Sequence, residues 1–176
     1  NGYYYLFAAQ GGTVFTHQEV VARSKTLDAN SFETEPGDVF LTNVDTPDSY
    51  IQKQGHGALV STPKGEWYYA SLCARPWNRP GESAYDPRGW STLGRETAIQ
   101  KMMWTEDGWL RMADGSNFVK MEVEEANLPE VKLSQVPSFD DFDGEELGNW
   151  YYAPRIMPQS FADVKARPGY VRIRGQ

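Results

Sequence analysis

Short aromatic segments that follow turn glycines recur along this chain, and no stretch carries a sustained helical period of apolar residues. The pattern occurs as NGYYYL from Asn1, as KGEWYY from Lys64 and as DGWLR from Asp107. The glycines of the last two copies lie 43 residues apart, close to the length of a four-stranded propeller blade. The first spacing is 63 residues, which leaves room for a loop insertion. We therefore predict an all-β fold built from propeller blades, with an all-β sandwich as the alternative.

Alternating or aromatic-rich segments bounded by Gly, Pro, Asn and Asp predict the individual strands. Residues 74–92 contain Pro, Gly, Arg and Trp without any period, so we expect a long functional loop there. Residues 27–38 are polar and rich in turn formers. The strands are expected at residues 2–9, 17–24, 39–42, 51–60, 66–73, 97–104, 109–112 and 168–174.

The character of the chain changes after Met112, which indicates a domain boundary. Residues 127–137 contain two prolines and little apolar content, so they predict an extended linker. Residues 138–176 then open a new acidic and aromatic segment, which is too short to close a β-domain of its own. At the other end, the Asn1-Gly2 turn normally joins two strands, so a preceding strand is expected outside this sequence. Both units are therefore expected to be incomplete.

Composition narrows the function classes. The net charge of −7 argues against a nucleic-acid partner, which needs a basic face. No run of 18 apolar residues occurs, so no membrane partner is expected. The single Cys73 has no internal disulfide partner, and its WYYASLC context predicts a buried strand thiol. The localisation stays open.

His56 is the most suggestive polar residue, because Gly55 and Gly57 beside it let the backbone approach another group closely. A satisfied core histidine is the alternative. His17 is a weaker candidate, and the two histidines lack ligand-type spacing with Asp, Glu or Cys. Arg95 stands at the mouth of a strand, where a guanidinium could hold vicinal sugar hydroxyls or form a structural salt bridge.

The acidic residues are poor catalytic candidates. A pairing of Glu96 with its neighbour Arg95 would lower the pKa of the carboxyl group, whereas a general acid needs a raised one. The acidic cluster Asp140, Asp141 and Asp143 indicates a solvated loop or a weak calcium site. No nucleotide-binding, nucleophile-elbow or zinc-protease motif occurs. The loop aromatics either stack on sugar rings or cover the propeller rim: Trp77, Tyr85 and Trp90.

Several long motifs resemble a known family, in the same order and over nearly the whole chain. The later propeller blades of glycoside hydrolase family 43 β-xylosidases are similar to NGYYYLFAAQGGT, HQEVVARS, IQKQGHGALVSTPKGEWYYASLCARP and LGRETAIQKMMWTEDGW. The β-sandwich domain that follows the propeller begins like FDDFDGEELGNWYYAPR. The resemblance implies the last blades of a five-bladed propeller over residues 1–126, a linker over 127–137 and the start of a β-sandwich over 138–176.

The resemblance also implies an inverting, exo-acting β-xylosidase that hydrolyses xylo-oligosaccharides with three carboxyl groups. All three belong to stretches upstream of this sequence, so no catalytic residue is assigned here, and the N-terminal half of the same enzyme is the expected partner. What carries over is substrate binding by His56, Arg95 and Thr13. No cofactor is expected to be required, although a structural calcium ion or a water near His56 is an option. The alternatives are an α-L-arabinofuranosidase or bifunctional enzyme of the family, a non-catalytic carbohydrate-binding β-domain, and a purely structural β-domain.

Overall fold

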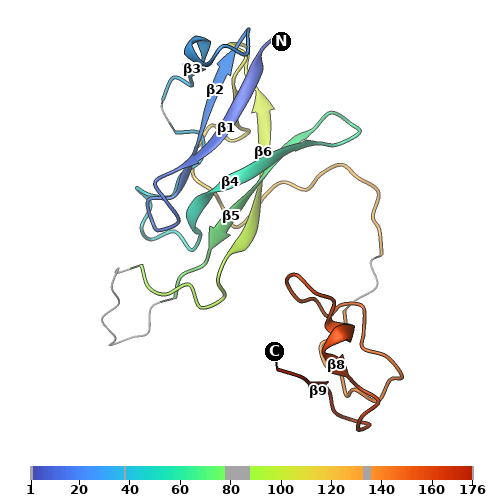
Figure 1. The fold of residues 1–176 in the computed structure, drawn as a ribbon. Coiled ribbons are helices and arrows are strands. Elements are labelled where there is room, and N and C mark those ends of the chain that lie inside the picture. Colours follow the sequence, from blue (N-terminus) through green and yellow to red (C-terminus); the bar gives the residue numbers. More distant parts are fainter. Residues whose placement is uncertain (1, 38, 78–87, 133–135, 176) are drawn as a thin grey trace. The chain divides into compact units, whose positions relative to one another are not determined.

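The computed structural model describes residues 2–37, 39–77, 88–132 and 136–175 and divides the chain into two compact units (Figure 1). The first unit is Asn1–Leu128 and the second is Pro129–Gln176. The regular elements of the described residues are strands and two 3-10 helices, so the all-β prediction is confirmed. None of the helices in these ranges is long and apolar enough to cross a membrane.

A three-stranded antiparallel sheet opens the first unit. It consists of β1 (Tyr4–Gln10), β2 (Gln18–Ser24) and β3 (Glu33–Thr34), in that order. β1 and β2 pair along their whole length, from Tyr4 opposite Ser24 to Gln10 opposite Gln18. The short 3-10 helix η1 (Ala29–Ser31) precedes β3, and the Asp28 side chain caps it by accepting a hydrogen bond from the Asn30 amide. The 11–17 connection between β1 and β2 is the part of this sheet that later forms the site.

The second sheet is a four-stranded antiparallel meander in chain order, as expected of one propeller blade. Its strands are β4 (Gln52–Ser61), β5 (Trp67–Ala74), β6 (Glu96–Trp104) and β7 (Leu110–Met112). The predicted turn glycines close two of its hairpins: the Gly65 amide donates to the Thr62 carbonyl and the Gly108 amide to the Thr105 carbonyl, both at 2.9 Å.

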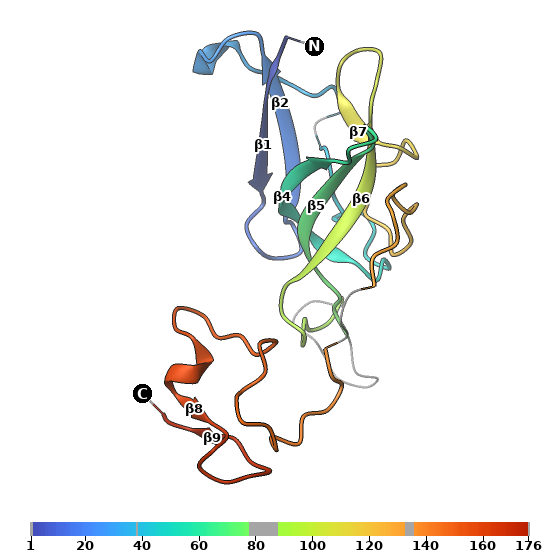
Figure 2. The ribbon, with the colours of Figure 1, turned by 90° about the vertical axis from the view of Figure 1, so that its right-hand side faces the viewer.

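The two sheets pack against each other around an aromatic core (Figure 2). Phe7 from β1, Phe40 from the following loop and Tyr69 from β5 form a triangle with ring centroids 5.0–5.5 Å apart. Tyr5 meets Trp104 edge-on at 4.9 Å. Aromatic side chains from both sheets therefore contribute to the core. Cys73 is 3% exposed, which confirms the predicted buried thiol, and burial raises its pKa.

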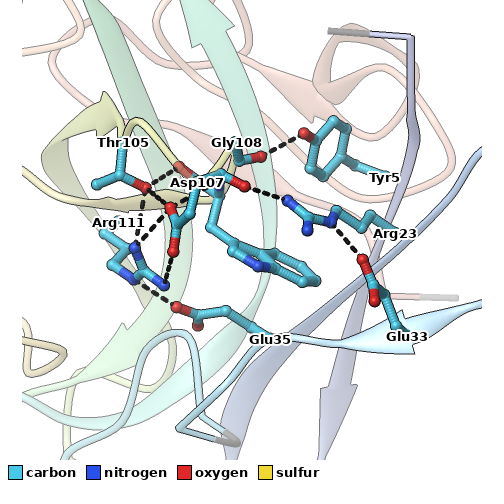
Figure 3. A network of polar contacts seen from close by, with 9 residues as sticks. Tyr5, Arg23, Glu33, Glu35, Thr105, Asp107, Gly108 and Arg111 are labelled. Carbon is cyan, nitrogen blue, oxygen red and sulfur yellow. Dashed lines mark hydrogen bonds and ion pairs between the residues drawn. The ribbon is translucent and has the colours of Figure 1, made fainter.

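A polar network ties the first sheet to the β6–β7 turn (Figure 3). Arg111 donates to Glu35 at 2.7 Å and to both carboxylate oxygens of Asp107 at 2.9–3.0 Å. Arg23 bonds Glu33 and the Asp107 carbonyl, and its guanidinium lies 4.1 Å from the centroid of the Trp109 ring. Burial raises the pKa of Glu35, whereas Arg111 holds the pKa of Asp107 well below its usual value.

The structure corrects two strand predictions in the first unit. Residues 39–42 form no strand; Leu41 makes only an isolated bridge to Glu19. The paired edge is instead β3, inside the polar 27–38 segment, where the side chains of Glu33 and Thr34 are exposed. Apolar content misled here, because Phe40 and Leu41 are buried as loop residues.

The second unit carries little regular structure. Its elements are the 3-10 helix η2 (Pro158–Ser160) and a two-stranded antiparallel ladder of β8 (Ala162–Asp163) and β9 (Arg172–Ile173). The predicted strand at 168–174 is therefore shorter than expected. The division into residues 1–126, 127–137 and 138–176 stays a prediction.

Candidate functional site

The backbone of β4 is distorted where it carries His56. The register against β5 shifts between Gln52 and Gly55 and again between Gly55 and Ala58. Lys53 and His56 both adopt left-handed conformations, with φ of 61° and 55°, which cost energy for residues other than glycine. The His56 side chain is exposed in the middle of this strand, between the buried Gly55 and the half-buried Gly57. Such bulges commonly re-aim a side chain next to a functional site.

The two glycines beside His56 are required by close packing, as their positions in the sequence suggested. A Cβ atom on Gly55 would lie 2.6 Å from Nε2 of His17. A Cβ atom on Gly57 would lie 2.3 Å from Cε1 of Tyr69 and 2.5 Å from the Ala70 carbonyl oxygen. The strand can therefore bulge around His56 only because both neighbours lack side chains.

His17 and Arg95 form a hydrogen-bonded pair next to the β4 bulge, where both contact the Lys53 carbonyl. Nη2 of Arg95 lies 2.7 Å from Nδ1 of His17, and Nη1 of Arg95 donates to the Lys53 carbonyl at 3.1 Å. A guanidinium has donors only, so the 2.7 Å contact with Arg95 makes Nδ1 of His17 an acceptor and assigns a neutral ring with its proton on Nε2. Nδ1 also lies 3.2 Å from the Lys53 carbonyl oxygen, which would need the other tautomer, and the shorter contact with Arg95 decides the assignment. Burial, assisted by the Arg95 charge, lowers the pKa of His17, which keeps the ring in that state. Partial desolvation also lowers the pKa of Arg95.

The three predicted binding residues line one recess of about 590 Å³. Thr13 comes from the β1–β2 connection, His56 from the β4 bulge and Arg95 from the residue before β6. His17, which the sequence ranked as a weaker candidate than His56, lines the same recess although only 4% of its surface is exposed. No local pattern could have found it, because its partner Arg95 lies 78 residues away. The remaining lining residues are Ala9, Gln10, Gly12 and Leu72.

Glu96 pairs with Arg75 and not with its chain neighbour Arg95. Glu96 accepts from Arg75 on Nη2 at 2.7 Å and on Nε at 3.0 Å, across the β5–β6 ladder. This partner lowers the pKa of Glu96. Successive residues of a strand point to opposite faces, so Arg95 is left to turn into the recess. Glu96 is thereby committed to an ion pair and is no candidate general acid.

The family model described as "Glycosyl hydrolases family 43" matches residues 1–110. The chain belongs to glycosyl hydrolase family 43. A putative beta-xylosidase of Escherichia coli K12 is 37% identical over 178 residues, covering 99% of this chain and 33% of the relative. The crystal structure of a xylan beta-1,4-xylosidase from Bacillus halodurans superposes with a TM-score of 0.83 at 44% identity, covering 99% of this chain and 32% of that one.

A further family 43 relative has a different activity in its name. The non-reducing end alpha-L-arabinofuranosidase of Bacteroides ovatus is 35% identical over 175 residues, or 98% of this chain and 31% of the relative. The chain thus spans about a third of the length of the relatives that it matches. The family resemblance found in the motifs is therefore confirmed, and the comparisons leave the substrate preference open.

The recess of this family 43 chain offers hydrogen-bonding side chains. Its described lining residues contain donors and acceptors but no carboxyl group, whereas glycoside hydrolysis needs an acid and a base carboxyl group on either side of the scissile bond. Glu19 is buried nearby, but its Oε1 accepts from the Tyr69 hydroxyl at 2.8 Å and it does not line the recess. Glu66 and Asp107 are held by Lys101 and Arg111.

The residues around His56 do not fit a calcium ion by themselves. Calcium takes six to eight oxygen ligands, with carboxylates prominent among them. The recess instead presents imidazoles and a guanidinium. Among the described residues, no three His, Cys, Asp or Glu side chains gather as a metal-ligand group, and this includes the Asp140, Asp141 and Asp143 cluster. An ion or a water near His56 stays a prediction.

Proposed function

We propose that this chain is part of an inverting, exo-acting β-xylosidase that hydrolyses xylo-oligosaccharides. In this enzyme it supplies the substrate-binding wall of the active site. One observation carries the proposal: Thr13, His56 and the His17–Arg95 pair converge on a recess whose described lining residues include no carboxyl group. Guanidinium, imidazole and hydroxyl groups can hold several sugar hydroxyls at once. The family resemblance supports the reaction type, and relatives named as xylosidases support the substrate.

The proposal includes a partner that brings the carboxyl groups. We assign this role to the N-terminal half of the same enzyme, either on the same polypeptide or as a second chain. The net charge of −7 argues against nucleic acid as a partner.

A second candidate activity is α-L-arabinofuranosidase, alone or combined with β-xylosidase activity. The arabinofuranosidase of Bacteroides ovatus, 35% identical over 98% of this chain, supports it. In that case the same recess holds a furanose ring, and residues outside this sequence set the preference.

Two assays test the proposal. This chain alone, checked for folding by circular dichroism, is expected to turn over neither an aryl β-xyloside nor an aryl α-L-arabinofuranoside. The full-length protein is expected to hydrolyse at least the xyloside and to release xylose with inverted anomeric configuration. Turnover by this chain alone that Glu96→Gln abolishes would contradict the proposal. Saccharide binding without turnover by the full-length protein would favour a non-catalytic carbohydrate-binding domain.

A further inference from the structure

A second recess, of about 400 Å³, is lined in part by the later residues of the β1–β2 connection. Gly12 and Thr13 line the candidate site, whereas Val14, Phe15 and Thr16 line the second recess. Its far wall is formed by the 88–91 segment, which includes Trp90 and Ser91. A connection of a few residues therefore separates the two recesses, and neither the proposed reaction nor the core makes use of the second one.

Lys53 links the two recesses. Its carbonyl accepts from Arg95 in the candidate site, while its ammonium donates to Ser91 at 3.0 Å in the second recess. The same ammonium lies 4.5 Å from the centroid of the Phe15 ring, and the Arg88 guanidinium lies 4.7 Å from it. Cations at such distances from an aromatic ring are attracted to it, so Phe15 is held in place. Lys53 thus connects the second recess to the hydrogen bonds of the candidate site.

Trp90 offers a flat aromatic face at this recess. It is 52% exposed, so about half of its surface stays in water. Its backbone is fixed by two hydrogen bonds of 2.9 Å with Trp77, one in each direction. A large aromatic ring on a fixed backbone loses little conformational freedom when a ligand packs on it. Packing a ligand against the exposed part of the ring would remove apolar surface from water and so favour binding.

We propose that the second recess binds a sugar ring on the reducing-end side of the residue held by His56 and Arg95, with Trp90 as its stacking face. The apolar C–H face of a pentose would lie on the Trp90 ring. Its hydroxyls would meet the Lys53 ammonium and the Thr16 hydroxyl oxygen, which can accept a hydrogen bond because its own proton goes to the Gly11 carbonyl. Apolar walls with a few placed polar groups are the usual composition of a small-molecule site. This inference rests on the proposed function, since it extends the same saccharide across the 12–16 segment.

The test compares two substrates in the full-length protein. Xylotriose has sugar rings on the leaving-group side, whereas β-xylosyl fluoride has none. Trp90→Ala is expected to lower kcat/KM for xylotriose on the order of tenfold, the size of an aromatic packing contribution, and to change the value for the fluoride less than twofold. Trp90→Phe, which keeps a ring, is expected to recover most of the loss. Tyr50→Ala, at a residue that is 80% exposed and lines neither recess, is the matched control and is expected to change neither value.

Each outcome decides. An equal loss on both substrates, or no loss on either, overturns the inference. If the wild-type protein hydrolyses neither substrate, the proposed function fails, and the inference is then decided by tryptophan fluorescence titration with xylotriose. An affinity for xylotriose that falls slightly in Trp90→Phe and further in Trp90→Ala would support the inference. Unchanged affinity would refute it.

Discussion

Gly55→Ala is the sharpest probe of the site, because its effect can be worked out from distances. The added Cβ would lie 2.6, 2.8 and 2.9 Å from Nε2, Cε1 and Cδ2 of His17. Carbon atoms in proteins settle at about 3.5–4.0 Å from their neighbours. The imidazole must therefore move by about 1 Å. The backbone φ of 155° adds strain for a residue with a side chain.

The displacement breaks the contact that orients Arg95. A shift of about 1 Å stretches the 2.7 Å bond between Arg95 and His17 beyond hydrogen-bond range. Overpacking costs about 1–3 kcal/mol and a lost hydrogen bond to a charged group about 1.5–3 kcal/mol. The two overlap, so we expect a loss of about 2–4 kcal/mol in the free energy of unfolding. Misplacement of a substrate-binding group by about 1 Å is expected to lower kcat/KM on the order of 100-fold.

Urea denaturation and kinetics of the full-length protein measure both effects. Gly65→Ala is the matched control, since Gly65 has a φ of 83° but nothing within 4 Å of its added Cβ. It should cost only about 1 kcal/mol and leave kcat/KM unchanged. The double variant His17→Ala/Gly55→Ala removes the obstacle, so it should lose at least about 1 kcal/mol less than the sum of the single variants. Additive losses would refute the steric reasoning.

The remaining predictions concern three side chains of the same unit. Arg95→Ala should lower kcat/KM on the order of 100-fold, because the side chain is exposed and works on the ligand, while it should cost no more than about 1.5–3 kcal/mol of stability for its bond to His17; a loss of folded protein that accounts for the whole fall in activity would make it structural. The pKa of His17 is lowered by burial, so the free energy of unfolding should rise with pH between the folded-state pKa and about 6.5. Its ring resonances should titrate below pH 6.5 in NMR, and a midpoint at or above that value would contradict the bond from Arg95. Arg111→Met should cost about 1–3 kcal/mol, since it leaves the buried Glu35 without its cation. That loss should be larger at pH 8 than at pH 5, because Glu35 is more fully charged at pH 8, and Glu35→Gln should offset it.

Local patterns were enough for the strands that carry turn glycines. β5, β6 and β7 begin within one residue of their predicted starts, because alternation and turn chemistry act between residues close in sequence. Tyr85 and most of the predicted 74–92 loop lie outside the described residues, so the prediction of a functional loop there stays open. The prediction of a strand at 39–42 was wrong, because an apolar sequence pattern indicates burial, and a buried segment can be a loop as well as a strand.

The sequence by itself determined that His56 sits between glycines, that Cys73 is a core thiol and that the chain is a family 43 β-protein. Only the tertiary structure decided what those glycines approach, which are the His17 ring and Tyr69. It also paired Arg95 with His17 and Glu96 with Arg75. The reason is physical: such contacts depend on how two sheets are registered and where β4 bulges, and no spacing along the chain encodes either. The recess exists because the β4 bulge brings His56 beside the His17–Arg95 pair.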